Sequence, residues 1–135
     1  LNHFSGPLGI GPYENKHADI FPQWQKDLKE LSVHENVFAK LGGLAMPVNG
    51  FGFHIQDKPP TSDEFILKQK AYYETALEYF TPKRCMFESN FPVDKTSISY
   101  PVLWNAFKKL ATSYSASEKD QLFYKTASTV YRITD

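Results

Sequence analysis

The feature that most constrains the fold is a repeated alternation of short apolar runs with longer amphipathic stretches. Apolar residues at three- and four-residue spacing predict helices over about 19–33, 61–80, 99–110 and 115–130. Shorter apolar runs predict strands at 37–41 and 84–88, and residues 1–3 have the pattern of a strand that is ending. Strands that alternate with helices pair in parallel through right-handed crossovers. The sequence therefore predicts an α/β fold.

Two of the helix starts carry a specific signal. The stretches "TSDE" at 61–64 and "SASE" at 115–118 are capping boxes, in which a hydroxyl and a carboxylate satisfy backbone N–H groups of the first turn. The first of these helices should end at residues 81–82, where a proline follows a threonine.

Size and composition exclude several classes of protein. The 135 residues suffice for one ordinary domain, and we treat residues 1–135 as a single partial domain. The chain has 15 Lys and Arg against 15 Asp and Glu, so no basic excess indicates nucleic-acid binding. The single cysteine, Cys85, excludes an internal disulfide, and no run is long and apolar enough to span a membrane. We expect a cytoplasmic protein that binds neither nucleic acid nor membrane.

The number of predicted strands is too small for a closed sheet. About three strand–helix units leave strand edges unpaired, whereas a complete (β/α)8 TIM barrel needs about 250 residues. We therefore expect that the chain is an incomplete fragment, with the beginning of a larger domain missing. Alternatively, two copies pair their half-barrels as a homo-oligomer.

Polar residues gather where the predicted strands end. In parallel α/β folds this edge of the sheet binds ligands. Alternation along the strands places Lys40 on one face of its strand and Glu88 and Asn90 on the same face of theirs. His3 follows the first strand end. Lys40 and Glu88 could pair, either as a salt bridge at a barrel mouth or as part of a binding site.

The loop between the second predicted strand and its helix, at about 44–61, is long and rich in glycine, proline and apolar residues. A loop of this length is functional or disordered, and its apolar content favours an ordered segment. It contains His54, for which packing and ligand contact remain equally open. The chain has no CxxC or HxxxH metal pair and no P-loop.

Three segments together resemble a known family. The stretches "LNHFSGPLGIGP", "NVFAKLGGL" and "RCMFESNFPVD", in this order, resemble the C-terminal part of the amidohydrolase-related proteins (amidohydrolase family 2). This family includes lactonases and aminocarboxymuconate-type decarboxylases. The resemblance implies a TIM barrel whose strand ends surround a divalent metal, such as zinc or manganese, or a reacting water.

The resemblance also assigns roles to residues. His3 stands where the family has a catalytic, metal-binding histidine, and Asn90 stands where it has an aspartate. The His-x-His pair of the family would precede Leu1. An asparagine side chain does not titrate and is a poor ligand for transition metals. Glu88, ~6.5 Å deeper on the same face of the strand, could supply the missing carboxylate, and so could Asp94 from the loop. We favour Glu88.

The function that follows from the resemblance is that of a hydrolase acting on a lactone or a similar small carboxylated carbonyl compound. Lys40 would hold a substrate carboxylate, and His54 would belong to a lid over the substrate. Two alternatives remain open. One is decarboxylation of the aminocarboxymuconate type on the same barrel, and the other is a catalytically inactive half-barrel that self-associates.

Overall fold

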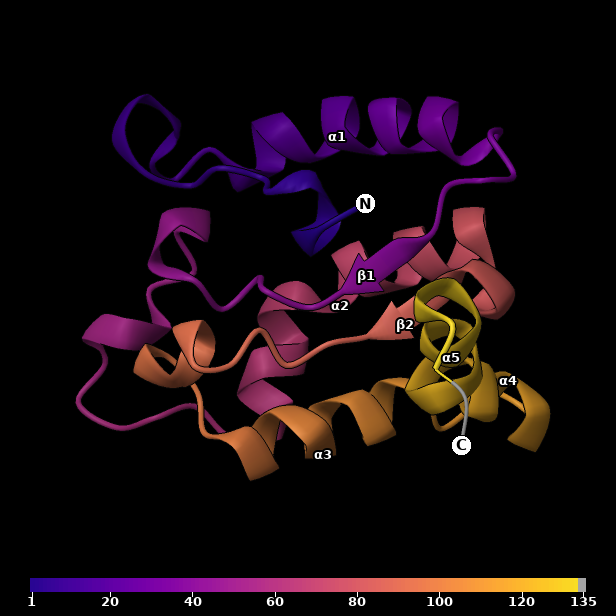
Figure 1. The fold of residues 1–135 in the computed structure, drawn as a ribbon. Helices are drawn as coiled ribbons and strands as arrows, with labels where there is room; N and C mark the ends of the chain where they lie inside the picture. The colour runs from indigo at the N-terminus through magenta and orange to yellow at the C-terminus, as the bar shows by residue number, and fades with distance from the viewer. Residues whose placement is uncertain (134–135) are drawn as a thin grey trace.

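The computed structural model describes residues 1–133 and shows two short parallel strands packed among helices (Figure 1). The predicted α/β class is thereby confirmed. The helices and strands are α1 (His17–Ser32), β1 (Ala39–Leu41), α2 (Ser62–Phe80), β2 (Cys85–Phe87), α3 (Tyr100–Leu110), α4 (Ala116–Asp120) and α5 (Thr126–Tyr131). A π-helical turn (Gln121–Lys125) joins α4 to α5, so the last predicted helix is continuous but not regular.

The sheet extends by one residue beyond its two strands. β1 and β2 pair in parallel with Lys40 beside Met86. On the other side of β1, the amino group of Leu1 donates to the Phe38 carbonyl at 2.7 Å, and the Lys40 N–H donates to the Leu1 carbonyl at 2.9 Å. Because neighbouring residues of a strand direct their backbone groups to opposite edges, Leu1 occupies the edge of β1 away from β2. Within residues 1–133 the sheet is not closed.

The helices surround the strand pair unevenly. In Figure 1, α1 and α3 lie on opposite sides of the two strands, and α2 passes behind them and contacts both helices. The segment from α4 to α5 packs against β2. No helix in the described part of the chain is long and apolar enough to cross a lipid bilayer.

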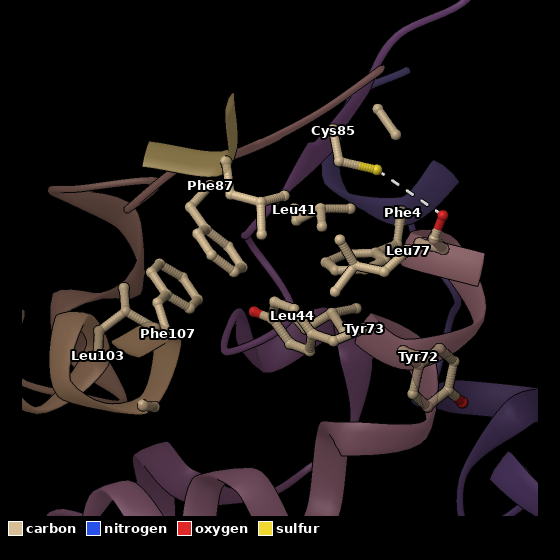
Figure 2. Close-up of a cluster of buried hydrophobic side chains, with 14 of the residues drawn as sticks. Phe4, Leu41, Leu44, Tyr72, Tyr73, Leu77, Cys85, Phe87, Leu103 and Phe107 are labelled. Carbon is tan, nitrogen blue, oxygen red and sulfur yellow. Dashed lines mark hydrogen bonds between the residues drawn. The ribbon is translucent and has the colours of Figure 1, made fainter. Parts of the chain in front are cut away.

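One face of the strand pair forms the core with α2 and α3. As the alternation predicted, the side chains of Ala39, Leu41, Cys85 and Phe87 are buried on this face. The Phe87 ring stacks on Phe107 of α3, with centroids 4.6 Å apart and planes at 6° (Figure 2). The Cys85 thiol points at the Ala76 carbonyl of α2 (Figure 2). Burial of this face leaves the opposite face, which carries Lys40 and Met86, to the site described below.

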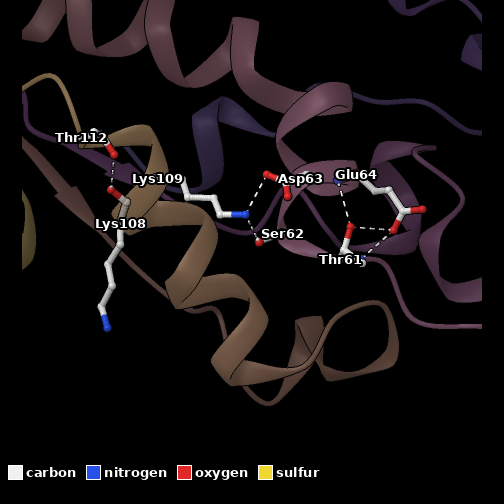
Figure 3. Close-up of polar contacts among 7 residues, drawn as sticks. All are labelled: Thr61, Ser62, Asp63, Glu64, Lys108, Lys109 and Thr112. Atoms are coloured by element: carbon white, nitrogen blue, oxygen red, sulfur yellow. Dashed lines mark hydrogen bonds and ion pairs between the residues drawn. The ribbon is translucent and has the colours of Figure 1, made fainter.

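Side chains at the helix ends fix how α2 and α3 meet. Both predicted capping boxes are present, and at α2 the Thr61 hydroxyl accepts from the Glu64 N–H while the Thr61 N–H donates to the Glu64 carboxylate (Figure 3). Lys109, near the end of α3, reaches back to Ser62 and Asp63 at 2.8 and 2.7 Å (Figure 3). These contacts tie the last turn of α3 to the first turn of α2.

Candidate functional site

A left-handed turn presents His3. Three consecutive non-glycine residues, His3, Phe4 and Ser5, have positive φ angles of 49°, 54° and 64°. Such a run costs conformational energy in L-residues, so the surrounding structure must stabilise it. The Phe4 side chain is buried with its ring edge-on to Tyr73 at 4.7 Å, and the Trp24 indole N–H donates to the Phe4 carbonyl at 2.8 Å. Core packing at Phe4 therefore sets the position of His3 beside it.

Glu88 joins His3 to Lys40. One carboxylate oxygen of Glu88 lies 2.7 Å from His3 Nδ1, and the other lies 2.6 Å from Lys40 Nζ. The predicted contact between Lys40 and Glu88 is confirmed. The three side chains come from the ends of three adjacent chain segments and are only partly exposed to solvent. Oε1 of Glu88 and Nδ1 of His3 are in ion-pair contact but have no aligned hydrogen-bond partner among the described residues. Glu88 lies on the Nδ1 side of the ring, so Nε2 is the nitrogen left for another group.

Two glycines allow this approach. Gly42 and Gly43 follow β1, and a side-chain Cβ at Gly42 would clash with the backbone of Glu88. A Cβ at Gly43, whose φ is 82°, would clash with the imidazole of His3. The sequence suggested only that these glycines end a strand. Because these glycines have no side chain, Glu88 can approach Gly42 closely and His3 can approach Gly43 closely.

The environment of Lys40 favours its charged form. The hydrogen bond to Glu88 is the largest cause that raises the pKa of Lys40, and partial burial opposes it. Tyr131, at the end of α5, raises the pKa of Lys40 further. The sequence analysis did not find Tyr131, because no local pattern connects the last helix with β1.

Asn90 is placed differently from Glu88. β2 ends at Phe87, and Asn90 adopts a left-handed φ of 52°, so strand alternation no longer governs its direction. Its side-chain amide donates to Oδ1 of Asp94 at 2.7 Å. The structure therefore pairs Asn90 with Asp94 in the loop after β2.

Asp94 is a buried carboxyl group. Its residue is 0% exposed, and Oδ2 accepts no hydrogen bond from a side chain in the described part of the chain. Burial raises the pKa of Asp94 to about 6, and the charge of Glu88 adds to this rise. The Asn90 amide, the Ala45 backbone N–H and His3 oppose it. A carboxyl group with this pKa exchanges protons near neutral pH, as acid–base catalysis requires.

His54 lies apart from this network. It is exposed in a 3-10 turn (Phe53–Ile55), where it borders a pocket together with Phe91, Lys95 and Tyr100. None of His3, Lys40 and Glu88 borders that pocket. The structure thus brings together His3, Lys40 and Glu88, and separately Asn90 and Asp94, and places His54 at a second location.

The described residues do not complete a metal site by themselves. Among residues 1–133, no three histidine, cysteine, aspartate or glutamate side chains lie close enough together to hold an ion. Glu88 occupies Nδ1 of His3, so Nε2 is the ring nitrogen that remains for a metal. One donor atom is too few for the four-coordinate sites typical of zinc.

Comparisons with known proteins identify the family of the chain. The sequence pattern of a family described as amidohydrolase matches residues 1–133. The chain belongs to the amidohydrolase family. An uncharacterised protein of Sinorhizobium fredii, y4mH, is 39% identical over 113 residues, which cover 84% of this chain and 34% of that protein.

Solved structures of amidohydrolases share the fold. A zinc-bound amidohydrolase from Burkholderia multivorans superimposes on 99% of the chain with a TM-score of 0.81 and 25% identity. A Pseudomonas putida protein described as a 2-pyrone-4,6-dicarboxylic acid hydrolase matches 97% with a TM-score of 0.61 and 19% identity, and supports the fold alone. The chain spans 43% and 41% of these two structures. It corresponds to part of an amidohydrolase structure.

Proposed function

We propose that this chain contributes part of the active site of a hydrolase that opens a lactone or a similar small carboxylated carbonyl compound. The observation that carries the proposal is the contact of Glu88 with both His3 and Lys40 at the carboxyl ends of the strands. Parallel α/β proteins bind substrates at this edge. Membership of the amidohydrolase family supports hydrolysis as the reaction class.

In this proposal His3 and Glu88 act together on the proton of the attacking water. Glu88 lies against the Nδ1 side of the His3 ring, which leaves Nε2 for the reacting water. As Nε2 takes the proton, the imidazole becomes positively charged, and the Glu88 carboxylate stabilises that charge at 2.7 Å. Glu88 therefore remains the carboxylate on which proton transfer depends.

Lys40 binds the negative charge of the substrate. An ammonium group has three N–H donors, and one of them is directed at Glu88. Tyr131 also interacts with this ammonium group, and the remaining donor would bind a substrate carboxylate or the oxyanion that develops during attack. The raised pKa of Lys40 keeps the group charged for this purpose.

Asn90 and Asp94 form the second half of the site. Asn90 does not titrate, and its amide orients the Asp94 carboxyl group. Because the pKa of Asp94 is about 6, a fraction of Asp94 is protonated near neutral pH. Because Asp94 is 0% exposed, it acts through Asn90, whose side chain it holds, and does not touch the substrate directly.

The proposal for the whole protein includes a divalent metal, zinc or manganese, because an amidohydrolase of similar fold binds zinc. Nε2 of His3 is the donor that this chain offers, and the remaining ligands would come from outside it. A bound metal would polarise the substrate carbonyl. Nε2 cannot hold a metal and accept a proton at the same time. Undiminished activity after removal of all metal by a chelator would therefore assign the proton role to His3.

The test compares two glutamate variants in the protein at its full natural length, assayed for proton release on a panel of small lactones. Glu88→Gln should lower kcat/KM at least a hundredfold, because loss of acid–base assistance typically costs 10²–10⁴-fold. Glu74→Gln is the matched control, since Glu74 is an exposed partner of Lys70 on α2. A Glu88→Gln protein with full activity would refute the proposed role.

Decarboxylation on the same scaffold is distinguished by its product. The same assay carried out on unsaturated carboxylates would release CO2 instead of a ring-opened acid. We further propose that the protein works in the cytoplasm, which the single buried thiol of Cys85 supports, since reduced cysteines are typical of that compartment.

A further inference from the structure

A pocket apart from the network of His3, Lys40 and Glu88 lies between the loop that follows β1 and the loop that follows β2. It has a volume of about 380 Å³, within the range of small-molecule sites. Its walls include Phe53, His54, Gln56 and Pro59 from the first loop, and Phe91 and residues 95–100 from the second. Since the Glu88 network does not border it, this pocket is a separate feature of the same edge of the sheet.

Aromatic rings form one wall of the pocket. Phe91 and Tyr100 meet edge to face, with centroids 5.2 Å apart and planes at 86°. Phe53 also lines the pocket, is buried, and stacks on Phe65 of α2 with centroids 6.0 Å apart. A flat ring of a ligand can pack against such a corner of perpendicular rings, and aromatic pairs of this geometry favour each other beyond simple burial.

The polar groups of the pocket favour an anion. Lys95 and His54 border it, and its lining contains no aspartate or glutamate. The first turn of α3 begins at Tyr100 in the lining, contains no acidic residue and has no side-chain cap. Ser97, also in the lining, is 3% exposed, and its hydroxyl has no hydrogen-bond partner among the described residues. A lysine ammonium group, an imidazole N–H, backbone N–H groups and an unpaired hydroxyl are all donors to a carboxylate.

We propose that this pocket binds a small aromatic carboxylate, with its ring against Phe91 and Tyr100 and its carboxylate toward Lys95 and His54. Both features are needed to explain the lining, because rings alone would suit any apolar molecule and cations alone would suit any anion. The inference does not depend on the hydrolytic reaction proposed above. The two sites share one loop, since Lys95 follows Asp94 directly.

The proposal is tested by titrating the chain with benzoate and following backbone amide signals by NMR. Saturable shifts should be confined to residues 53–59 and 91–100. Benzamide has the same ring without the charge, and acetate has the charge without the ring. Both should bind at least threefold more weakly than benzoate. Equal binding of benzamide, or no saturable shift with benzoate, would overturn the proposal.

Two lysine variants identify the cation. Lys95→Gln should weaken benzoate binding about three- to fivefold, the range expected for one exposed ion pair. Lys58→Gln is the control, because Lys58 is exposed in the first loop but does not border the pocket. Tyr100→Leu should weaken benzoate and benzamide alike, because it removes a ring and no charge. Unchanged benzoate binding by Lys95→Gln would contradict the assignment.

Discussion

His3 Nδ1 and Glu88 Oε1 lie 2.7 Å apart, although the two residues are 85 positions apart in the sequence. This contact depends on a strained turn at one end and on a strand end at the other. Gly43 lies against the His3 ring and Gly42 against Glu88, and neither has a side chain that would fill the space.

Replacement of Gly43 by alanine should destabilise the protein more than replacement of Gly52. Both glycines have positive φ angles, 82° and 73°, so both variants carry the backbone penalty of about 1 kcal/mol or more. At Gly43 the added Cβ would also clash with the His3 ring, whereas at Gly52 nothing lies within 4 Å. The difference in the free energy of unfolding between the two variants, measured by urea denaturation, gives the cost of the clash with His3. Equal losses would show that His3 does not occupy the space beside Gly43.

Asp94 should make stability decrease as pH rises. Its folded pKa of about 6 lies above the ordinary value of 3.8, so the folded state binds more protons than the unfolded state between these values. The free energy of unfolding contributed by Asp94 is therefore complete below about pH 4 and is lost as pH rises through 6, by up to about 3 kcal/mol. Urea denaturation from pH 4 to 7 measures this loss.

The Asp94→Asn variant should remove this dependence. An asparagine can still accept from Asn90 through its carbonyl oxygen but cannot ionise, so the variant should be more stable than the wild type at pH 7. Asp57→Asn, in the exposed part of the first loop, is the control and should follow the wild-type profile. An Asp94→Asn variant that is less stable than the wild type at pH 7 would show that the ionised Asp94 carboxylate stabilises the folded protein.

The sequence predicted those parts of the structure that depend on local periodicity. The helices around Trp24 and Tyr73, the two capping boxes and the contact of Lys40 with Glu88 all follow from spacing along a helix or alternation along a strand. Asn90 shows where this reasoning stops. Alternation assumes an extended backbone. Asn90, three residues after the end of β2, has a left-handed conformation.

Other parts of the site depend on contacts between distant segments. The turn at His3 is held by Trp24 and Tyr73, neither of which has a sequence signal that refers to residue 3. Tyr131 approaches Lys40 only because α5 packs against β2. The double glycine at 42–43 was the one available signal, since adjacent glycines at a strand end often permit a close approach of another segment.

As the alternative to a catalytic role for Lys40, we propose an inactive half-barrel, two copies of which associate through the face of the strands opposite the core. A groove there is lined by Lys40, Asn2 and Asn36 and by apolar or aromatic residues that include Val37, Phe38, Met86 and Tyr131. Pairing of two such faces would bury it. Light scattering on the purified chain should give the mass of a dimer, and Phe38→Glu should shift the mass to that of a monomer. A monodisperse monomer at high concentration would contradict self-association.

The tautomer of His3 reports the contact between His3 and Glu88 without any assay of activity. Long-range ¹H–¹⁵N NMR spectra of the imidazole, recorded at alkaline pH, distinguish a proton on Nδ1 from a proton on Nε2. The close approach of Glu88 to Nδ1 predicts the Nδ1–H form in the wild type and a partial loss of this form in a Glu88→Leu variant. A wild-type protein with the proton on Nε2 would contradict this prediction.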